Sequence, residues 1–111
     1  MINTNIMKNK QKPNRQGDVL ILPINEIPTN LVETKKCTLA LGEATGHHHT
    51  IFENVVGYSN TEDGLADYFE VTDTTADLVH QEHDTIPITK GKYRKVIQSE
   101  FTPEEIKHVI D

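Results

Sequence analysis

Residue types that usually build a protein core are scarce in this chain of 111 residues. There is no tryptophan, aromatic residues make up 5% of the chain, and hydrophobic residues of all kinds make up 35%. The length allows one domain with one modest core, which must consist mainly of valine, isoleucine and leucine. A core this thin would gain from extra stabilisation, and a bound metal ion is one way to provide it.

Cysteine and long apolar segments are also lacking. Cys37 is the only cysteine, so the chain cannot form an internal disulfide, and we expect a reducing compartment. This residue is either a nucleophile or simply a small side chain packed in a strand. No stretch approaches the roughly 20 apolar residues of a membrane span, and the first residues lack the apolar run of a signal peptide. We therefore expect a soluble, cytoplasmic protein that does not contact membranes.

Positive charge is concentrated in two short segments. The net charge is −6, but four of the 11 basic residues precede the first acidic residue, Asp18, so the rest of the chain carries 7 basic and 17 acidic side chains. Such an acidic body disfavours non-specific binding of nucleic acid. The second basic segment includes Lys90, Lys92 and Arg94, which share one face of an extended strand. They either contact phosphate or an acidic partner, or form a solvated face that guards a sheet edge.

The order of apolar and turn-forming residues predicts a single β-rich domain over residues 16–111, after a flexible tail over residues 1–15. Short apolar segments recur about every ten residues, with turn signals between them at 60–64 and 90–91. This spacing is typical of a small antiparallel β-barrel or sandwich. The expected strands are Val19–Leu22, Thr38–Leu41, His47–Phe52, Ala66–Thr72, Thr74–His80, Thr85–Thr89 and Tyr93–Gln98.

The last ten residues differ in kind from the strands. Thr102 provides a capping hydroxyl, Pro103 fits the first helical position, and Glu105 completes a capping box. The apolar residues that follow lie at helical spacing. We therefore expect one short helix at the C-terminal end of the chain.

Five of the six histidines lie in two short windows, residues 47–49 and 80–83. Imidazole is the commonest metal ligand and titrates near neutral pH, so this clustering is the feature that points most directly to chemistry. Side chains alternate along a strand, so His47, His49 and Glu53 are expected on one face and His48 on the other. His47, His49 and Glu53 together could bind zinc, iron, nickel or manganese.

The segment from Gly42 to Gly57 resembles the first motif of cupins, in which a His-x-His pair and a following Glu supply metal ligands inside a small barrel. His47, His49 and Glu53 match those three positions. The leading glycine is displaced by one residue. The second cupin motif is absent, because the proline and glycine of that region follow the last histidine instead of preceding it. The resemblance implies a cupin-like barrel with an interior metal site.

A broader resemblance covers most of the chain. It is similar to a family of small bacterial and phage proteins for which we know of no established activity, and this similarity implies a shared fold. The segments that carry it are Gln16–Leu20, Gly42–His49 with its Gly-His-x-His motif, the His-x-Glu-His motif at His80–His83, and Gly91 with Tyr93.

The second histidine window provides further ligands or acid–base groups. A spacing of three lets His80 and His83 face one ion if the chain turns between them, and Glu82 could orient an imidazole. We therefore expect one of these two histidines to join His47 and His49 in one site.

Three functions remain open. In the first, a divalent metal held by His47, His49, Glu53 and His80 or His83 activates water or binds a small anionic ligand. In the second, a metal-independent ribonuclease-like site uses His80, Glu82 and His83 as acid and base, and Lys92 and Arg94 stabilise phosphate.

The third function is not enzymatic. It is an interaction module, such as a phage-encoded inhibitor of a host protein, with an acidic surface that mimics nucleic acid. The sequence does not determine the oligomeric state, for which a homodimer is one option.

Overall fold

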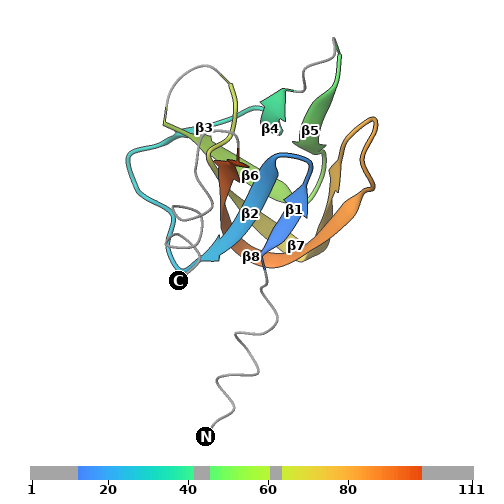
Figure 1. Ribbon diagram of the computed structural model, residues 1–111. Coiled ribbons are helices and arrows are strands. Elements are labelled where there is room, and N and C mark those ends of the chain that lie inside the picture. Colours follow the sequence, from blue (N-terminus) through green and yellow to red (C-terminus); the bar gives the residue numbers. More distant parts are fainter. Residues whose placement is uncertain (1–12, 42–45, 61–63, 99–111) are drawn as a thin grey trace, which may run out of the picture.

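The structure, a computed structural model, describes residues 13–41, 46–60 and 64–98. This part of the chain is built from β-strands, and none of its segments is a helix long and apolar enough to cross a membrane. Figure 1 shows how the strands are arranged. They are β1 (Asn14–Gln16), β2 (Val19–Ile24), β3 (Val32–Glu33), β4 (Cys37–Leu41), β5 (His48–Ile51), β6 (Val55–Ser59), β7 (Tyr68–Val79) and β8 (Ile86–Ile97).

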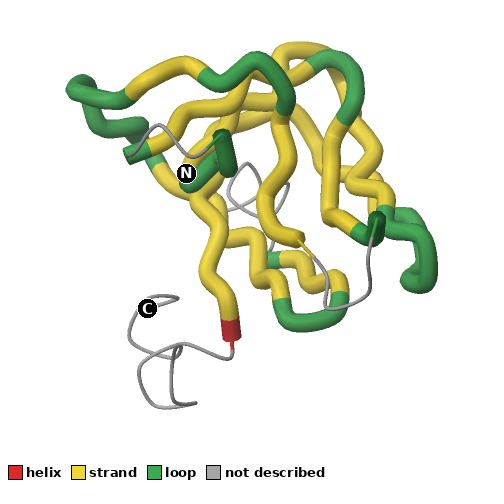
Figure 2. The backbone as a smooth tube through the Cα atoms, turned by 90° about the horizontal axis from the view of Figure 1, so that it is seen from above, coloured by secondary structure: helices red, strands yellow, loops and turns green. Residues whose placement is uncertain are grey.

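The strands form one open sheet with antiparallel ladders. The main path runs β1-β2-β8-β7-β5-β4, and β6 pairs with both β7 and β3. Strand β7 has two partners on one side, because its first residues pair with β6 and its last residues pair with β5. The sheet curls over itself (Figure 2), so that Lys95 of β8 donates a hydrogen bond to the carbonyl of Leu39 in β4, which is not its neighbour in the sheet.

The concave face of the curled sheet encloses the core. Its largest fully buried side chains include Phe69 and Tyr93, whose rings stack with centroids 5.3 Å apart. Ile51 of β5 and Leu78 of β7 are register partners and both point into this core. The core is therefore mainly aliphatic, as the composition predicts. Its buried members are Val19, Ile21, Cys37, Leu39, Ile51, Ala66, Phe69, Val71, Ala76, Leu78, Ile88 and Tyr93.

The prediction of a mainly antiparallel β fold is confirmed, although the strands differ in length from those expected. The strands expected at 66–72 and 74–80 are one continuous strand, β7, with an irregularity in its pairing between Val71 and Thr75. The strands expected at 85–89 and 93–98 are also one strand, β8. Gly91 does not form a turn there, because it pairs with Val71 within the β7–β8 ladder.

Other differences lie at the first strand, around residue 32 and around residue 55. Residues Asn14–Gln16, expected to belong to a tail and a turn, form β1 and pair with β2. Strands β3 and β6 were not predicted; β6 contains Gly57, which weakens the strand pattern. The predicted C-terminal helix and residues 1–12 of the predicted tail lie outside the described residues.

Candidate functional site

Strand register brings the two histidine windows together. Thr50 of β5 is opposite Val79 of β7, so the preceding residue His49 lies opposite His80. The side chains of His49 and His80 point inward like those of Ile51 and Leu78, two residues away, because side chains alternate along each strand. The rings of His49 and His80 have centroids 4.3 Å apart, and both residues are buried. The polar pair thus lies at one end of the apolar core.

Two further imidazoles surround His80. After β7 ends, the chain bends at residues 81–83 and returns His83 toward His80, with ring centroids 4.6 Å apart. His83 also stacks on His49 at 6.0 Å, and His47 meets the His80 ring at 5.6 Å. The predicted turn between His80 and His83 therefore does bring the two residues together. We call His47, His49, His80 and His83 the histidine cluster.

Gln16, on the short first strand, fixes the protonation pattern of His49. Its side-chain Nε2 donates hydrogen bonds to the carbonyls of Leu78 and Asp84, both at 2.9 Å. Its Oε1 must therefore be the atom that lies 2.8 Å from His49 Nδ1, and it accepts the proton of that nitrogen. In the neutral ring this leaves the lone pair on His49 Nε2. The sequence marks Gln16 only as the start of a segment shared with a family, and its role beside His49 follows from the sheet register alone.

Burial keeps the centre of the cluster uncharged. It lowers the pKa of His49 to about 4, and the neighbouring His80 and His83 act in the same direction, whereas Asp18 opposes them. Burial also lowers the pKa of His80, again reinforced by His83 and by His47. Both rings are therefore neutral at pH 7, the state in which an imidazole can act as a base or as a ligand.

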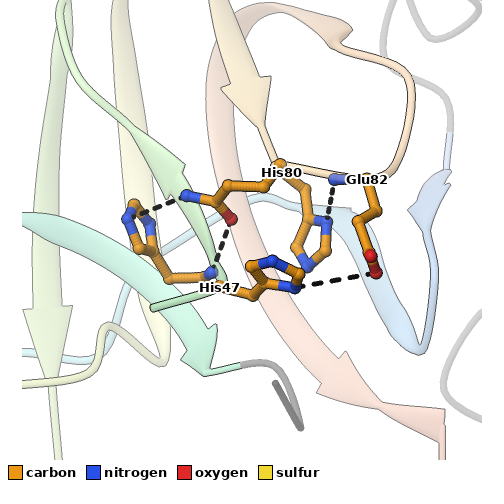
Figure 3. Close-up of polar contacts among 5 residues, drawn as sticks. His47, His80 and Glu82 are labelled. Atoms are coloured by element: carbon orange, nitrogen blue, oxygen red, sulfur yellow. Dashed lines mark hydrogen bonds and ion pairs between the residues drawn. The ribbon is translucent and has the colours of Figure 1, made fainter. Parts of the chain in front are cut away.

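Glu82 contacts two members of the cluster (Figure 3). Its backbone N–H donates to His80 Nδ1 at 3.0 Å, so the neutral His80 ring carries its proton on Nε2. Its carboxylate lies 3.6 Å from His47 Nδ1. The expectation that Glu82 orients an imidazole fits these two contacts.

Gly17 provides the space in which the rings meet. It lies in the tight turn between β1 and β2 with φ +58, a conformation that favours glycine. A Cβ added there would lie 2.8 Å from His83 Nε2 and 3.4 Å from His49 Cε1. The backbone of this turn therefore forms one wall of the cluster, a role that is invisible in the sequence.

His48 points away from the cluster, as strand alternation predicts. Its Nδ1 lies 2.6 Å from Thr50 Oγ1, two residues along the same face of β5. Its backbone N–H donates to Gln81 Oε1 at 2.9 Å. His48 is thus bound to the loop that carries His80 and His83.

The structure does not bring Glu53 to the cluster. Strand β5 ends at Ile51, and Glu53 lies in the following turn, where it lines a surface cavity with Asp77 of β7. The alternation that placed Glu53 on the face of His47 and His49 stops with the strand. The place beside His47 and His49 that was expected for Glu53 is occupied by the His80–His83 loop, which lies at the opposite end of β5.

The basic residues of the ribonuclease hypothesis lie on the other face of the sheet. Tyr93 points into the core, so its neighbours Lys92 and Arg94 point outward, whereas the histidine cluster lies on the inner face. Lys92 instead lies 4.0 Å from the carboxylate of Glu26. A phosphate held between the cluster and these two cations is therefore not supported by the geometry.

Across residues 13–41, 46–60 and 64–98, no group of three or more His, Cys, Asp or Glu side chains is placed so that it could hold a metal ion. What the cluster offers is a set of neighbouring imidazoles at the end of the core, at least two of them neutral at pH 7.

Comparison with known proteins agrees with the resemblance to a family of no established activity. No curated protein and no solved structure matches the chain significantly. A family model described as a domain of unknown function, DUF8820, matches residues 15–98, which include every strand from β2 to β8 and the whole histidine cluster. This small antiparallel β protein therefore belongs to the DUF8820 family.

Proposed function

We propose that the histidine cluster binds one divalent transition metal ion, with His49, His80 and His83 as ligands and His47 beside them. The spacing of the rings carries this proposal. For metal–nitrogen distances of 2.0–2.1 Å in a tetrahedral site, the ring centroids of two histidine ligands lie roughly 5 Å apart. The three ring separations, 4.3, 4.6 and 6.0 Å, lie around that value.

The protonation of His49 supports the same function. Because Gln16 accepts the Nδ1 proton, the Nε2 lone pair is free to bind an ion, and the ring is already neutral at pH 7. Binding therefore needs no proton release from this residue. A hydrogen bond from the second nitrogen of a metal-bound imidazole is the usual way in which proteins orient such ligands.

His80 must change its hydrogen bonding for an ion to bind. Its Nδ1 lone pair accepts the Glu82 amide proton, and its Nε2 carries a proton. A metal ion therefore has to displace the Glu82 amide from Nδ1, or the ring proton has to move from Nε2 to Nδ1, so that Nε2 becomes the ligand and Nδ1 no longer accepts the Glu82 N–H. Either change alters the environment of the Glu82 N–H, which can be observed directly.

Three protein ligands leave a position for water or a small anion, as in catalytic zinc sites. The exposed Glu82 carboxylate lies at the rim of the cluster, next to His47. A bound ion would lower the pKa of a coordinated water, and Glu82 is suitably placed to accept its proton. The function we infer is therefore binding of a small anionic ligand, or hydrolysis, at a metal centre.

The experiment is elemental analysis of protein purified without an affinity tag, followed by titration of the metal-free protein with Zn²⁺ and Co²⁺. We expect one ion per chain, a melting temperature lowered by chelator, and a shift of the Glu82 amide resonance on metal addition. His49→Ala should abolish stoichiometric binding, whereas Thr85→Ala, at an exposed position in the loop that carries His80 and His83, should not alter it. Equal melting with chelator and with Zn²⁺, and an unmoved Glu82 resonance, would contradict the proposal.

A further inference from the structure

Gln81 joins the two histidine windows through hydrogen bonds to a single residue. Its side-chain Oε1 accepts the backbone N–H of His48 at 2.9 Å, and its Nε2 lies 3.2 Å from His48 Nε2. Gln81 lies next to His80 in the chain, and His48 lies between His47 and His49. The contact thus connects the central part of one window to the central part of the other.

The direction of each hydrogen bond in this contact is determined. Since Gln81 Oε1 accepts from a backbone N–H, its amide nitrogen faces the His48 ring and donates to Nε2. His48 Nδ1 then carries the ring proton and donates to Thr50 Oγ1. Thr50 in turn lies 2.9 Å from Thr38 Oγ1 on β4. The His48 ring is therefore held at both nitrogens and cannot rotate without breaking hydrogen bonds.

This contact lies where the sheet itself no longer holds the loop. The β5–β7 ladder ends at the pair Thr50–Val79, so His80 and the residues after it extend beyond the last register partner. Gln81 attaches the start of the loop to β5, and Gln16 Nε2 attaches its far end by donating to the Asp84 carbonyl. The loop that carries His80 and His83 is thus fixed at both ends by glutamine side chains.

We infer that Gln81 is a positioning residue for the metal site: by binding His48, it holds the 80–83 loop so that His80 and His83 face His49 before an ion arrives. This inference rests on the proposed metal-binding function. Gln81 itself points away from the cluster and does not bind the ion. Gln81 raises the metal affinity because it keeps the loop ordered in the metal-free protein, so that metal binding costs less conformational entropy.

Replacing Gln81 tests this role. Gln81→Ala should weaken Co²⁺ binding by about 10-fold, the lower end of the range for residues that hydrogen-bond metal ligands directly, because Gln81 acts through His48. The visible Co²⁺ spectrum at saturation should keep its shape, because the ligands are unchanged. Thr85→Ala, in the same loop and also exposed, should bind Co²⁺ like the parent. In the metal-free protein, Gln81→Ala should also speed amide exchange at residues 80–83.

A double variant separates positioning from a general loss of stability. His48→Ala removes the ring but keeps the backbone N–H, so its affinity should lie between those of the parent and Gln81→Ala. Combining both changes should cause no further loss than Gln81→Ala alone, because the two residues act through one contact. Additive losses, or unchanged affinity in Gln81→Ala while the parent binds Co²⁺, would overturn the inference and leave the metal site standing. If the parent itself binds no Co²⁺, the proposed function fails and the inference fails with it.

Discussion

At the residue scale, the histidine cluster depends on a position that has no side chain. Gly17 → Ala would place a methyl group 2.8 Å from His83 Nε2, closer than a Cβ normally approaches another atom. We expect the free energy of unfolding to fall by about 2–4 kcal/mol, part from the positive φ and part from overpacking. Urea denaturation measures this change.

Gly64 provides the matched control for that substitution. Its φ is +91, and an added Cβ would meet nothing within 4 Å. Gly64→Ala therefore imposes backbone strain without a new contact, and should cost about 1–2 kcal/mol. If the two variants lose the same stability and Gly17→Ala binds metal like the parent, the turn does not form a wall of the cluster.

Cys37 is the other residue for which the structure decides between two interpretations of the sequence. The side chain is buried in the core, and burial raises the pKa of its thiol to about 12, although nearby Lys95 opposes the shift. A thiol with this pKa is almost entirely protonated at pH 8 and reacts poorly. We expect iodoacetamide to leave Cys37 unmodified in the folded protein and to modify it quickly in urea, as followed by mass spectrometry. Rapid modification of the native protein would restore the nucleophile interpretation.

At the scale of the elements, the sequence predicts the strands that have a clear apolar pattern and misses those defined by distant partners. Strand alternation alone predicts that His47 and His49 share one face, and the rings of both lie against His80 in the histidine cluster. The length of β7 and β8 cannot be predicted in this way, because residues such as Gly91 have local turn preferences that long-range pairing overrides. Gln16 and Gln81 could not be predicted as partners of the cluster, since their roles depend on register across the sheet.

Closure of the curled sheet depends on one partly buried ion pair. The Lys95 side chain is 11% exposed, and its ammonium lies 3.8 Å from Asp67 Oδ1 and donates to the Leu39 carbonyl. Asp67→Asn keeps an oxygen that can accept from the Asn60 backbone N–H, but leaves the Lys95 charge without its counterion. Because Asp67 is partly exposed, we expect a loss of about 1–2 kcal/mol in urea denaturation, less than for a fully buried pair.

The ion pair between Lys92 and Glu26 serves as a comparison for that change. It is longer, 4.0 Å, and the Glu26 side chain is 86% exposed. Glu26→Gln should therefore alter the free energy of unfolding by less than about 0.5 kcal/mol. Equal effects of the two substitutions would mean that burial of Lys95 does not matter to the curl of the sheet.

At the scale of the whole molecule, the histidine cluster makes folding sensitive to acid. The unfolded chain protonates His49 near its ordinary pKa of 6.5, whereas the folded protein holds it neutral down to about pH 4. Between these values the unfolded state binds more protons, so stability falls as the pH falls. The lowered pKa of His80 acts in the same direction. The stability that depends on neutral imidazoles is thus complete above pH 6.5 and is lost on acidification toward pH 4.

Urea denaturation of the metal-free protein at pH 7 and pH 5, with chelator present, measures this loss. For His49 alone, the lowered pKa corresponds to a loss of about 2 kcal/mol in the free energy of unfolding between pH 7 and pH 5. His49→Gln removes the titrating group, so its stability should change less over the same interval. A titration of the ring resonances in the folded protein provides a second measurement that does not depend on the variant folding. If His49 titrates near pH 6.5 in the folded protein, burial does not lower its pKa, and this residue does not cause a loss of stability between pH 7 and pH 5.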